Sequence, residues 1–239
     1  MSAPPLENGS VAATALDVDA LVFDMDGLLL DTESLALRAL RDAGEEVGLA
    51  MPDVLCRSMI GVAADRSRLL FTEHHGAAAP AEALFAAAAR RLEAQVDAGL
   101  LRLKPGVTAL LDRADDAGLP CAVATSSARA KALHHLRTAG IFDRFAAVVT
   151  RDEVTHGKPH PDLYLHAARA LATRPERCLA LEDSYNGVRA AHAAGMPVIM
   201  VPDLLPATDE MRAACLAIVD DLHAVVPLLP AASPLRRVP

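Results

Sequence analysis

The chain has 239 residues, of which 52% are hydrophobic and 3% are aromatic, and its formal net charge is −8. This length suits one large domain or one domain with a smaller insertion, and the apolar content predicts a packed aliphatic core instead of a disordered chain. The acidic balance argues against nucleic acid as a partner, because phosphate backbones attract clustered Lys and Arg.

The sequence also bears on location and on the chain ends. It contains no long apolar stretch of the kind that crosses a membrane and no basic segment followed by an apolar one, so we expect no membrane partner. Four cysteines are scattered without paired spacing: Cys56, Cys121, Cys178 and Cys215. We interpret them as reduced thiols and expect a cytoplasmic protein. Residues 1–16 and 230–239 have the composition of flexible tails.

The first predicted strand is the apolar run Ala20–Phe23, and the tetrad Asp24-Met25-Asp26-Gly27 follows it directly. Two carboxylates therefore emerge together where a buried strand ends. One can attack an electrophile while the other transfers protons, and together they can hold a divalent cation. The alternative is structural, because Asp-Gly is a common turn dipeptide and an Asp after a strand often caps the next helix.

The segment after the tetrad, residues 34–101, has helical patterning and no convincing strand. Its expected helices include Leu35–Val47 and Ala81–Ala98, and Pro105-Gly106 marks the return to the main domain. We therefore predict a helical cap domain over 34–101, inserted into a core domain formed by 17–33 and 102–229. The cap either adds stability alone or acts as a lid over the site, and its position just after the paired aspartates favours the lid.

The rest of the chain alternates between short apolar runs and helical segments. The further predicted strands are Cys121–Ala124, Ala146–Val149, Cys178–Leu181, Val198–Val201 and Leu216–Val219. The predicted helices between them include Val107–Ala117, Ala128–Ala139, Pro161–Ala172 and Gly187–Ala194, and several end at glycines suited to a helix C-terminus: Gly118, Gly140 and Gly195. Continuous apolar strands alternating with helices predict an α/β fold with a doubly wound, mainly parallel, Rossmann-like sheet.

In such a sheet, ligands bind beyond the carboxyl ends of the strands. Thr125 and Ser126 follow the second run, where hydroxyls and helix N–H groups can hold phosphate oxygens, although such residues also cap helices. Lys158 follows the third run and can screen an anionic nucleophile from an anionic phosphate, although a loop lysine is usually solvated. Glu182 and Asp183 end the fourth run, and this second acidic pair with oxygen ligands alone indicates Mg²⁺, although both can also act as helix caps.

Together these residues resemble the haloacid dehalogenase superfamily of aspartate-nucleophile hydrolases, in the branch with a helical cap after the first strand. Its four motifs appear in order across about residues 18–223: Asp24-Met25-Asp26-Gly27, Thr125, Gly157-Lys158-Pro159 and Glu182-Asp183-Ser184. Chance matches to four separated motifs in the right structural context are rare, so the combination is specific.

The resemblance implies a role for each residue. Asp24 attacks phosphorus in line and forms an aspartyl-phosphate, while Asp26 protonates the leaving oxygen and later deprotonates the hydrolytic water. Thr125 and the backbone of Ser126 hold the transferring phosphoryl group, and Lys158 neutralises charge on the nucleophile and the phosphate.

The resemblance also implies a Mg²⁺ cofactor. Its ligands are the Asp24 carboxylate, the Asp26 backbone carbonyl and Asp183, with Glu182 acting through a water. The expected partner is a small phosphorylated metabolite, and the expected assembly is a monomer or a small homo-oligomer.

Several branches of the superfamily are disfavoured by residues that this chain has or lacks. Dehalogenases do not carry an aspartate at the position of Asp26. Phosphonate-cleaving relatives need a cap lysine, and there is none between residues 34 and 101. The β-phosphoglucomutase relatives carry a histidine near the place of Leu35-Ala36, where this chain has none. The stretches Asp24–Glu33 and His156–Pro159 also resemble the pseudouridine-5'-phosphatase group.

The sequence therefore predicts a Mg²⁺-dependent phosphatase acting on a small soluble phosphomonoester, either a sugar phosphate or a nucleoside monophosphate. A β-phosphoglucomutase-like phosphotransferase is the nearest alternative, followed by a catalytically idle module that binds a phosphometabolite and by a scaffolding protein. Specificity is expected to reside in the cap, where a few charged side chains are candidates for substrate contact, most of them expected to be solvated: Arg57, Arg66, Arg68, His74 and His75.

Overall fold

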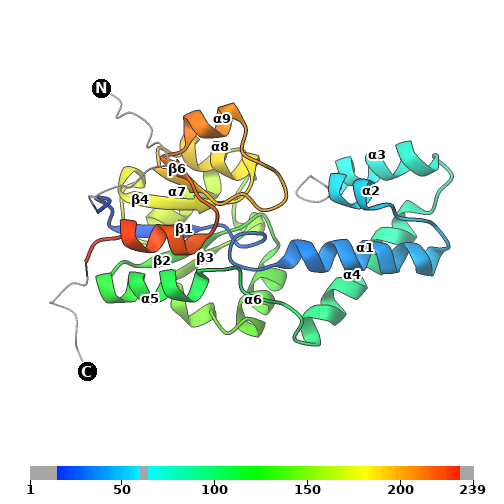
Figure 1. Ribbon diagram of the computed structural model, residues 1–239, viewed down its shortest axis with the longest axis horizontal. Coiled ribbons are helices and arrows are strands. Elements are labelled where there is room, and N and C mark those ends of the chain that lie inside the picture. The colour runs from blue at the N-terminus through cyan, green and yellow to red at the C-terminus, as the bar shows by residue number, and fades with distance from the viewer. Residues whose placement is uncertain (1–14, 60–63, 232–239) are drawn as a thin grey trace. The chain divides into compact units, whose positions relative to one another are not determined.

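The computed structural model describes residues 15–59 and 64–231 (Figure 1). Contacts divide the chain into two compact units: a helical unit, Asp31–Arg102, and an α/β unit formed by the segments that end at Leu30 and begin at Leu103. The predicted tails lie outside the described residues except at 15–16 and 230–231. There the backbone N–H of Leu16 donates to the carbonyl of Leu228 at 2.8 Å.

The α/β unit is built on one six-stranded sheet whose paired strands are all parallel. Its strands are β1 (Ala20–Phe23), β2 (Cys121–Ala124), β3 (Ala147–Val149), β4 (Cys178–Glu182), β5 (Val198–Met200) and β6 (Ala217–Ile218). All six predicted strands are confirmed to within two residues at each end. The spatial order β3-β2-β1-β4-β5-β6 reverses direction between β1 and β4, which is where doubly wound sheets bind ligands.

Helices cover the sheet of the α/β unit (Figure 1). They are α5 (Val107–Ala117), α6 (Arg129–Thr138), α7 (Asp162–Ala170), α8 (Tyr185–Ala193) and α9 (Asp209–Ala214), with short 3₁₀ turns at Phe142–Arg144, Arg151–Glu153, Pro175–Arg177 and Leu222–Leu228. Ala20 and Val22 of β1 belong to the core cluster that α7, α8 and α9 form on one face. The alternate residues Leu21 and Phe23 are buried as well. Burial of both faces explains why the strands are continuous apolar runs.

The helical unit contains α1 (Thr32–Val47), α2 (Asp53–Ser58), α3 (Ala64–His75) and α4 (Ala81–Asp97). The helices α1 and α4 pack side by side (Figure 1), and side chains such as Leu40, Phe71 and Leu84 form a core within this unit. The predicted helices at α1 and α4 are confirmed, whereas α2 and α3 were not predicted individually. Residues 60–63 of the predicted cap lie outside the described residues.

Two further expectations concern the cysteines and the presence of membrane-spanning helices. All four cysteines are buried free thiols, as the sequence predicts. Over residues 15–59 and 64–231, no helix combines the length and the apolar character needed to span a membrane.

Candidate active site

The turn after β1 separates the two aspartates of the tetrad. The backbone N–H of Asp24 donates to the Leu181 carbonyl at 3.0 Å, which continues the pairing of β1 with β4 by one residue. Gly27 has φ of 87°, a conformation that a side chain strongly disfavours, and its N–H closes the turn onto the Leu30 carbonyl at 2.9 Å. Asp24 is therefore buried at the sheet edge, whereas Asp26 lies beyond it and is half-buried.

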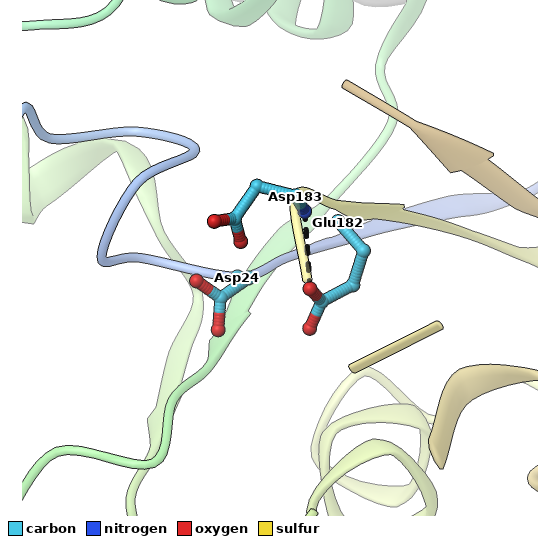
Figure 2. A group of neighbouring side chains, drawn as sticks. All are labelled: Asp24, Glu182 and Asp183. Atoms are coloured by element: carbon cyan, nitrogen blue, oxygen red, sulfur yellow. Dashed lines mark hydrogen bonds between the residues drawn. The ribbon is translucent and has the colours of Figure 1, made fainter. Parts of the chain in front are cut away.

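Three buried carboxylates meet beside this turn. Figure 2 shows Asp24 at the end of β1, with Glu182 and Asp183 at the end of the neighbouring strand β4. One carboxylate oxygen from each residue lies within 4.8 Å of the others. Because the two strands are adjacent and parallel, their carboxyl ends place these side chains together at the point where the strand order reverses.

Lys158 bridges two of the three carboxylates. It comes from the loop between β3 and α7, and its Nζ donates to Asp24 Oδ1 and Glu182 Oε1. Its side chain is only 5% exposed. Lys158 is therefore not a solvated loop residue, and its functional role stays a prediction.

The shared environment changes the proton affinities of these groups. Burial raises the pKa of Asp24 to about 8, with Glu182 and Asp26 adding to the increase and Lys158 opposing it. Burial by itself disfavours the charged form of Lys158, yet Asp24 and Glu182 raise its pKa above the usual range, so this side chain is an ammonium. Burial is the largest cause of the raised pKa of Asp24, and it outweighs the opposing effect of the ion pair with Lys158.

Glu182 is enclosed by donors on both of its oxygens. Oε1 accepts from Lys158 and from the Tyr164 hydroxyl at 2.6 Å. Oε2 accepts from the N–H of Asp183 at 3.1 Å, the N–H of Ser184 at 3.1 Å and the Ser184 hydroxyl at 3.0 Å. The first turn of α8 leaves room for this carboxylate only because residue 187 is glycine, since a Cβ there would lie 1.7 Å from Oε1.

Asp26 is surrounded by hydroxyls instead of by charge. Its Oδ2 accepts from the Ser127 hydroxyl at 2.8 Å and from the Thr125 hydroxyl at 3.4 Å. The N–H of Ser127 donates in turn to Thr125 Oγ1 at 3.0 Å, which closes the turn after β2. The other oxygen, Oδ1, is buried and has no hydrogen-bond partner among residues 15–59 and 64–231. One acceptor of this carboxylate therefore stays available to a ligand.

The donor set fits a hard divalent cation. Asp24, Glu182 and Asp183 supply only oxygen atoms, and Lys158 offsets one of their three charges. Taking so much negative charge out of water is costly unless a cation compensates it. Oxygen-only sites that combine a few carboxylates with waters are the kind that bind Mg²⁺.

The structure brings the predicted site residues to one edge of the sheet: Asp24, Asp26, Thr125, Ser126, Lys158, Glu182 and Asp183. Of these, Ser126 is exposed, between the two residues that contact Asp26. Sequence reasoning gave no role to Ser127 or Tyr164. Ser127 belongs to a run of three hydroxyl residues after β2, which was a usable signal, whereas Tyr164 reads as one more apolar position on the core face of α7.

The cap candidates all lie in the helical unit, and several of them have partners within it. Arg68 pairs with Glu82, with 2.6 Å between Nε and Oε1. Arg66 Nη1 lies 3.8 Å from Glu73 Oε1, and the His75 ring packs on Phe71 with 4.8 Å between centroids. Their contact with a substrate, and that of Arg57 and His74, stays a prediction.

Comparison with known proteins identifies a family model, haloacid dehalogenase-like hydrolase, that matches residues 18–195. YhcW of Bacillus subtilis (strain 168) is 38% identical over 192 residues, which cover 80% of this chain and 86% of YhcW. The phosphorylated carbohydrates phosphatase of Thermotoga maritima is 32% identical over 187 residues, 75% of this chain and 82% of that protein.

A solved structure is also similar. The crystal structure of CbbY from Rhodobacter sphaeroides in complex with phosphate superposes with a TM-score of 0.72 at 29% identity, covering 87% of this chain and 96% of CbbY. A variant of the same protein has been solved with xylulose-(1,5)bisphosphate.

Proposed function

The chain belongs to the haloacid dehalogenase-like hydrolases, and within this family we propose that it is a Mg²⁺-dependent phosphatase of a small soluble phosphomonoester. The observation that carries the proposal is the different environment of the two aspartates. Asp24 is buried against Lys158, whereas Asp26 is half-buried and accepts hydrogen bonds from hydroxyls. Two carboxyl groups with different surroundings can divide a nucleophilic role from an acid–base role.

In the first step, an oxygen of the Asp24 carboxylate attacks phosphorus while the bond from phosphorus to the leaving alcohol breaks. Asp26 gives its proton to the leaving oxygen and becomes a carboxylate. In the second step, Asp26 takes a proton from a water whose oxygen attacks the aspartyl-phosphate. The phosphorus–oxygen bond to Asp24 then breaks and releases inorganic phosphate, which restores both aspartates.

The remaining site residues stabilise the transferring group. Lys158 holds a positive charge beside the nucleophile and reduces its repulsion of the incoming phosphate. Thr125 and the backbone of Ser126, at the end of β2, are the proposed donors to the phosphoryl oxygens.

The donor set described above supports a bound Mg²⁺. We assign its ligands to the Asp24 carboxylate, the Asp26 backbone carbonyl and Asp183, with Glu182 acting through a water. Such an ion, when bound, supplies Lewis-acid stabilisation of charge on the phosphoryl oxygens.

Two relatives support sugar phosphates as the substrate class, although the sequence alone left nucleoside monophosphates equally open. One is named for phosphorylated carbohydrates, and CbbY has been solved with a sugar bisphosphate. The proposed substrate is therefore a small sugar phosphate, and nucleoside monophosphates are the comparison class.

The test is phosphate release from a panel of sugar phosphates, nucleoside monophosphates and short-chain phosphates, with Mg²⁺ and with a chelator. Asp24→Asn is the matched blank, because the change is nearly isosteric and removes the nucleophile, together with one proposed metal ligand. We expect Mg²⁺-dependent release that peaks on the sugar phosphates and disappears in Asp24→Asn, with an unchanged circular dichroism spectrum.

Other results would contradict parts of the proposal. Turnover that survives in Asp24→Asn rules out this nucleophile. Transfer of phosphate between sugar positions without net release favours the phosphotransferase. Binding of a phosphometabolite by calorimetry, with neither release nor transfer, favours an idle binding module.

A further inference from the structure

Tyr164 contacts two residues of the candidate site, Lys158 and Glu182. It projects from α7, is fully buried in the core cluster of the α/β unit, and donates its hydroxyl hydrogen to Glu182 Oε1 at 2.6 Å. Lys158 Nζ lies 5.1 Å from the centroid of its ring, within the range of a cation–π contact. One side chain thus contacts both the lysine and the acid that holds the lysine.

Tyr164 and Lys158 donate to the same oxygen of Glu182, so the hydroxyl of Tyr164 acts directly on the carboxylate that holds the lysine. Glu182 Oε1 has two lone pairs, and these two residues supply a donor to each. The other oxygen is held by the N–H groups of Asp183 and Ser184 and by the Ser184 hydroxyl. With both oxygens fully engaged, the Glu182 carboxylate has one orientation, and that orientation directs Lys158 to Asp24.

We propose that Tyr164 is a positioning residue for the reaction: its hydroxyl fixes Glu182, and its ring and Glu182 together fix the Lys158 ammonium on the nucleophile Asp24. This inference rests on the proposed phosphatase function. Without the hydroxyl, Lys158 is the only donor to Oε1, and the carboxylate is free to turn away from the lysine. The ammonium then spends less time beside Asp24, where it offsets the charge of the incoming phosphate.

A purely structural role is the alternative, because a buried tyrosine hydroxyl needs an acceptor wherever it lies. The chain offers an internal control for this alternative. Its only other tyrosine, Tyr185, donates its hydroxyl to the backbone carbonyl of Pro206, not to a side chain of the site. Removing each hydroxyl in turn therefore distinguishes two effects: the general loss of a tyrosine hydrogen bond, and the loss of the hydrogen bond from Tyr164 to Glu182.

The experiment compares Tyr164→Phe with Tyr185→Phe, each keeping its ring. For the sugar phosphate that the wild type hydrolyses fastest, we expect Tyr164→Phe to lower kcat about tenfold, the equivalent of one buried hydrogen bond, with KM within about twofold. Tyr185→Phe is expected to keep both constants within about twofold of wild type. Tyr164→Met removes the ring as well and is expected to lower kcat further.

Binding of Mg²⁺ to the metal-free protein, measured by calorimetry, is the second readout. A site that has collapsed binds the ion more weakly, whereas a Glu182 released by Tyr164→Phe leaves the affinity equal or makes it tighter. Urea unfolding shows whether each variant is folded at the assay temperature.

The possible outcomes distinguish failure of the proposed function from failure of the positioning role of Tyr164. A wild type that hydrolyses no phosphomonoester overturns the proposed function. An active wild type with an unchanged kcat in Tyr164→Phe overturns the role of Tyr164 and leaves the function standing. An equal fall of kcat in Tyr185→Phe, a loss confined to KM, or weaker Mg²⁺ binding by Tyr164→Phe also overturns the positioning role.

Discussion

Both units of the chain carry ion pairs on their surfaces, but the α/β unit also buries a cluster of charges. In the α/β unit, Lys158 lies between Asp24 and Glu182 with side chains that are 5%, 9% and 0% exposed. In the helical unit, Glu46 pairs with Arg90 and Arg91, and all three side chains are at least 40% exposed. Surface pairs of that kind are ordinary, whereas a buried cluster with excess negative charge opposes folding unless it is compensated. We therefore propose that the buried charges serve the chemistry of the site.

Both units bury their own apolar cores, so packing does not explain the difference. If the buried cluster is functional, then the same chemical substitution has a large effect in the α/β unit and almost none in the helical unit.

After the loss of turnover expected in Asp24→Asn, the largest effect is expected from Asp26→Asn. The amide oxygen can still accept from Ser127 and Thr125, so the fold is kept, but proton transfer is lost and kcat falls about 10²- to 10⁴-fold. Comparing an alkyl phosphate with 4-nitrophenyl phosphate tests the reason, since a nitrophenolate leaves without a proton and its hydrolysis loses less. Because Asp26 also serves the second step, which is the same for both substrates, the comparison uses the rate of release of the alcohol or phenol in a single turnover. An equal loss of that rate on both substrates would show that Asp26 is not the acid.

Glu182→Gln is expected to have the next largest effect. The amide nitrogen has to face either Lys158 and Tyr164 or the donors of Asp183 and Ser184, and no orientation satisfies all of them. We expect kcat to fall about 10²-fold and the free energy of unfolding to fall by about 2 kcal/mol or more. Steady-state kinetics measures kcat, and urea unfolding measures the free energy of unfolding. A variant with wild-type kcat would mean that the buried cluster is only structural.

A smaller effect is expected in the pH dependence of stability and of Mg²⁺ affinity. Burial raises the pKa of Asp24 from 3.8 to about 8 in the metal-free protein, so this carboxyl opposes folding increasingly as the pH rises between these values. Mg²⁺ requires the ionised form and displaces the proton, so its apparent affinity should fall up to about tenfold for each pH unit below about 8. Calorimetry in buffers of different ionisation enthalpy measures the released proton.

Asp24→Asn is the control for this linkage, because it cannot take up or release the proton. Its residual Mg²⁺ affinity is expected to vary much less with pH than that of the wild type. If the wild-type affinity is also independent of pH between about 6 and 8, the raised pKa of Asp24 is wrong.

The α/β unit was the more predictable of the two from sequence. The strands β1, β2, β4 and β5 are buried at every position, so each appears as a continuous apolar run, whereas the outermost strands β3 and β6 are only partly buried. The polar residues that follow the runs meet at one sheet edge. The positions of Asp24, Lys158 and Glu182 could therefore be predicted from the sequence alone. The choice of Ser127 over Ser126 could not, because the turn after β2 decides which hydroxyl reaches Asp26.

The helical unit was harder to predict because its short helices lack a clean apolar stripe. In α3, Leu69 is 47% exposed while Phe71 is fully buried, so neighbouring apolar residues point in different directions. The helix α2 has only six residues, too few to show a period. The helices of this unit are stabilised mainly by packing against one another. The sequence pattern predicts only the two long ones, α1 and α4.

Glu46→Gln, the counterpart of Glu182→Gln, should have the smallest effect. Glu46 accepts from Arg90 and Arg91 on the surface of the helical unit, where solvent and salt screen the charges. We expect a loss of less than about 1 kcal/mol in the free energy of unfolding and a kcat within about twofold of wild type. The same two measurements on both variants give the comparison directly. If Glu46→Gln lowers kcat as much as Glu182→Gln does, burial of charge does not mark the functional residues of this chain, and the helical unit has to be included in the chemistry.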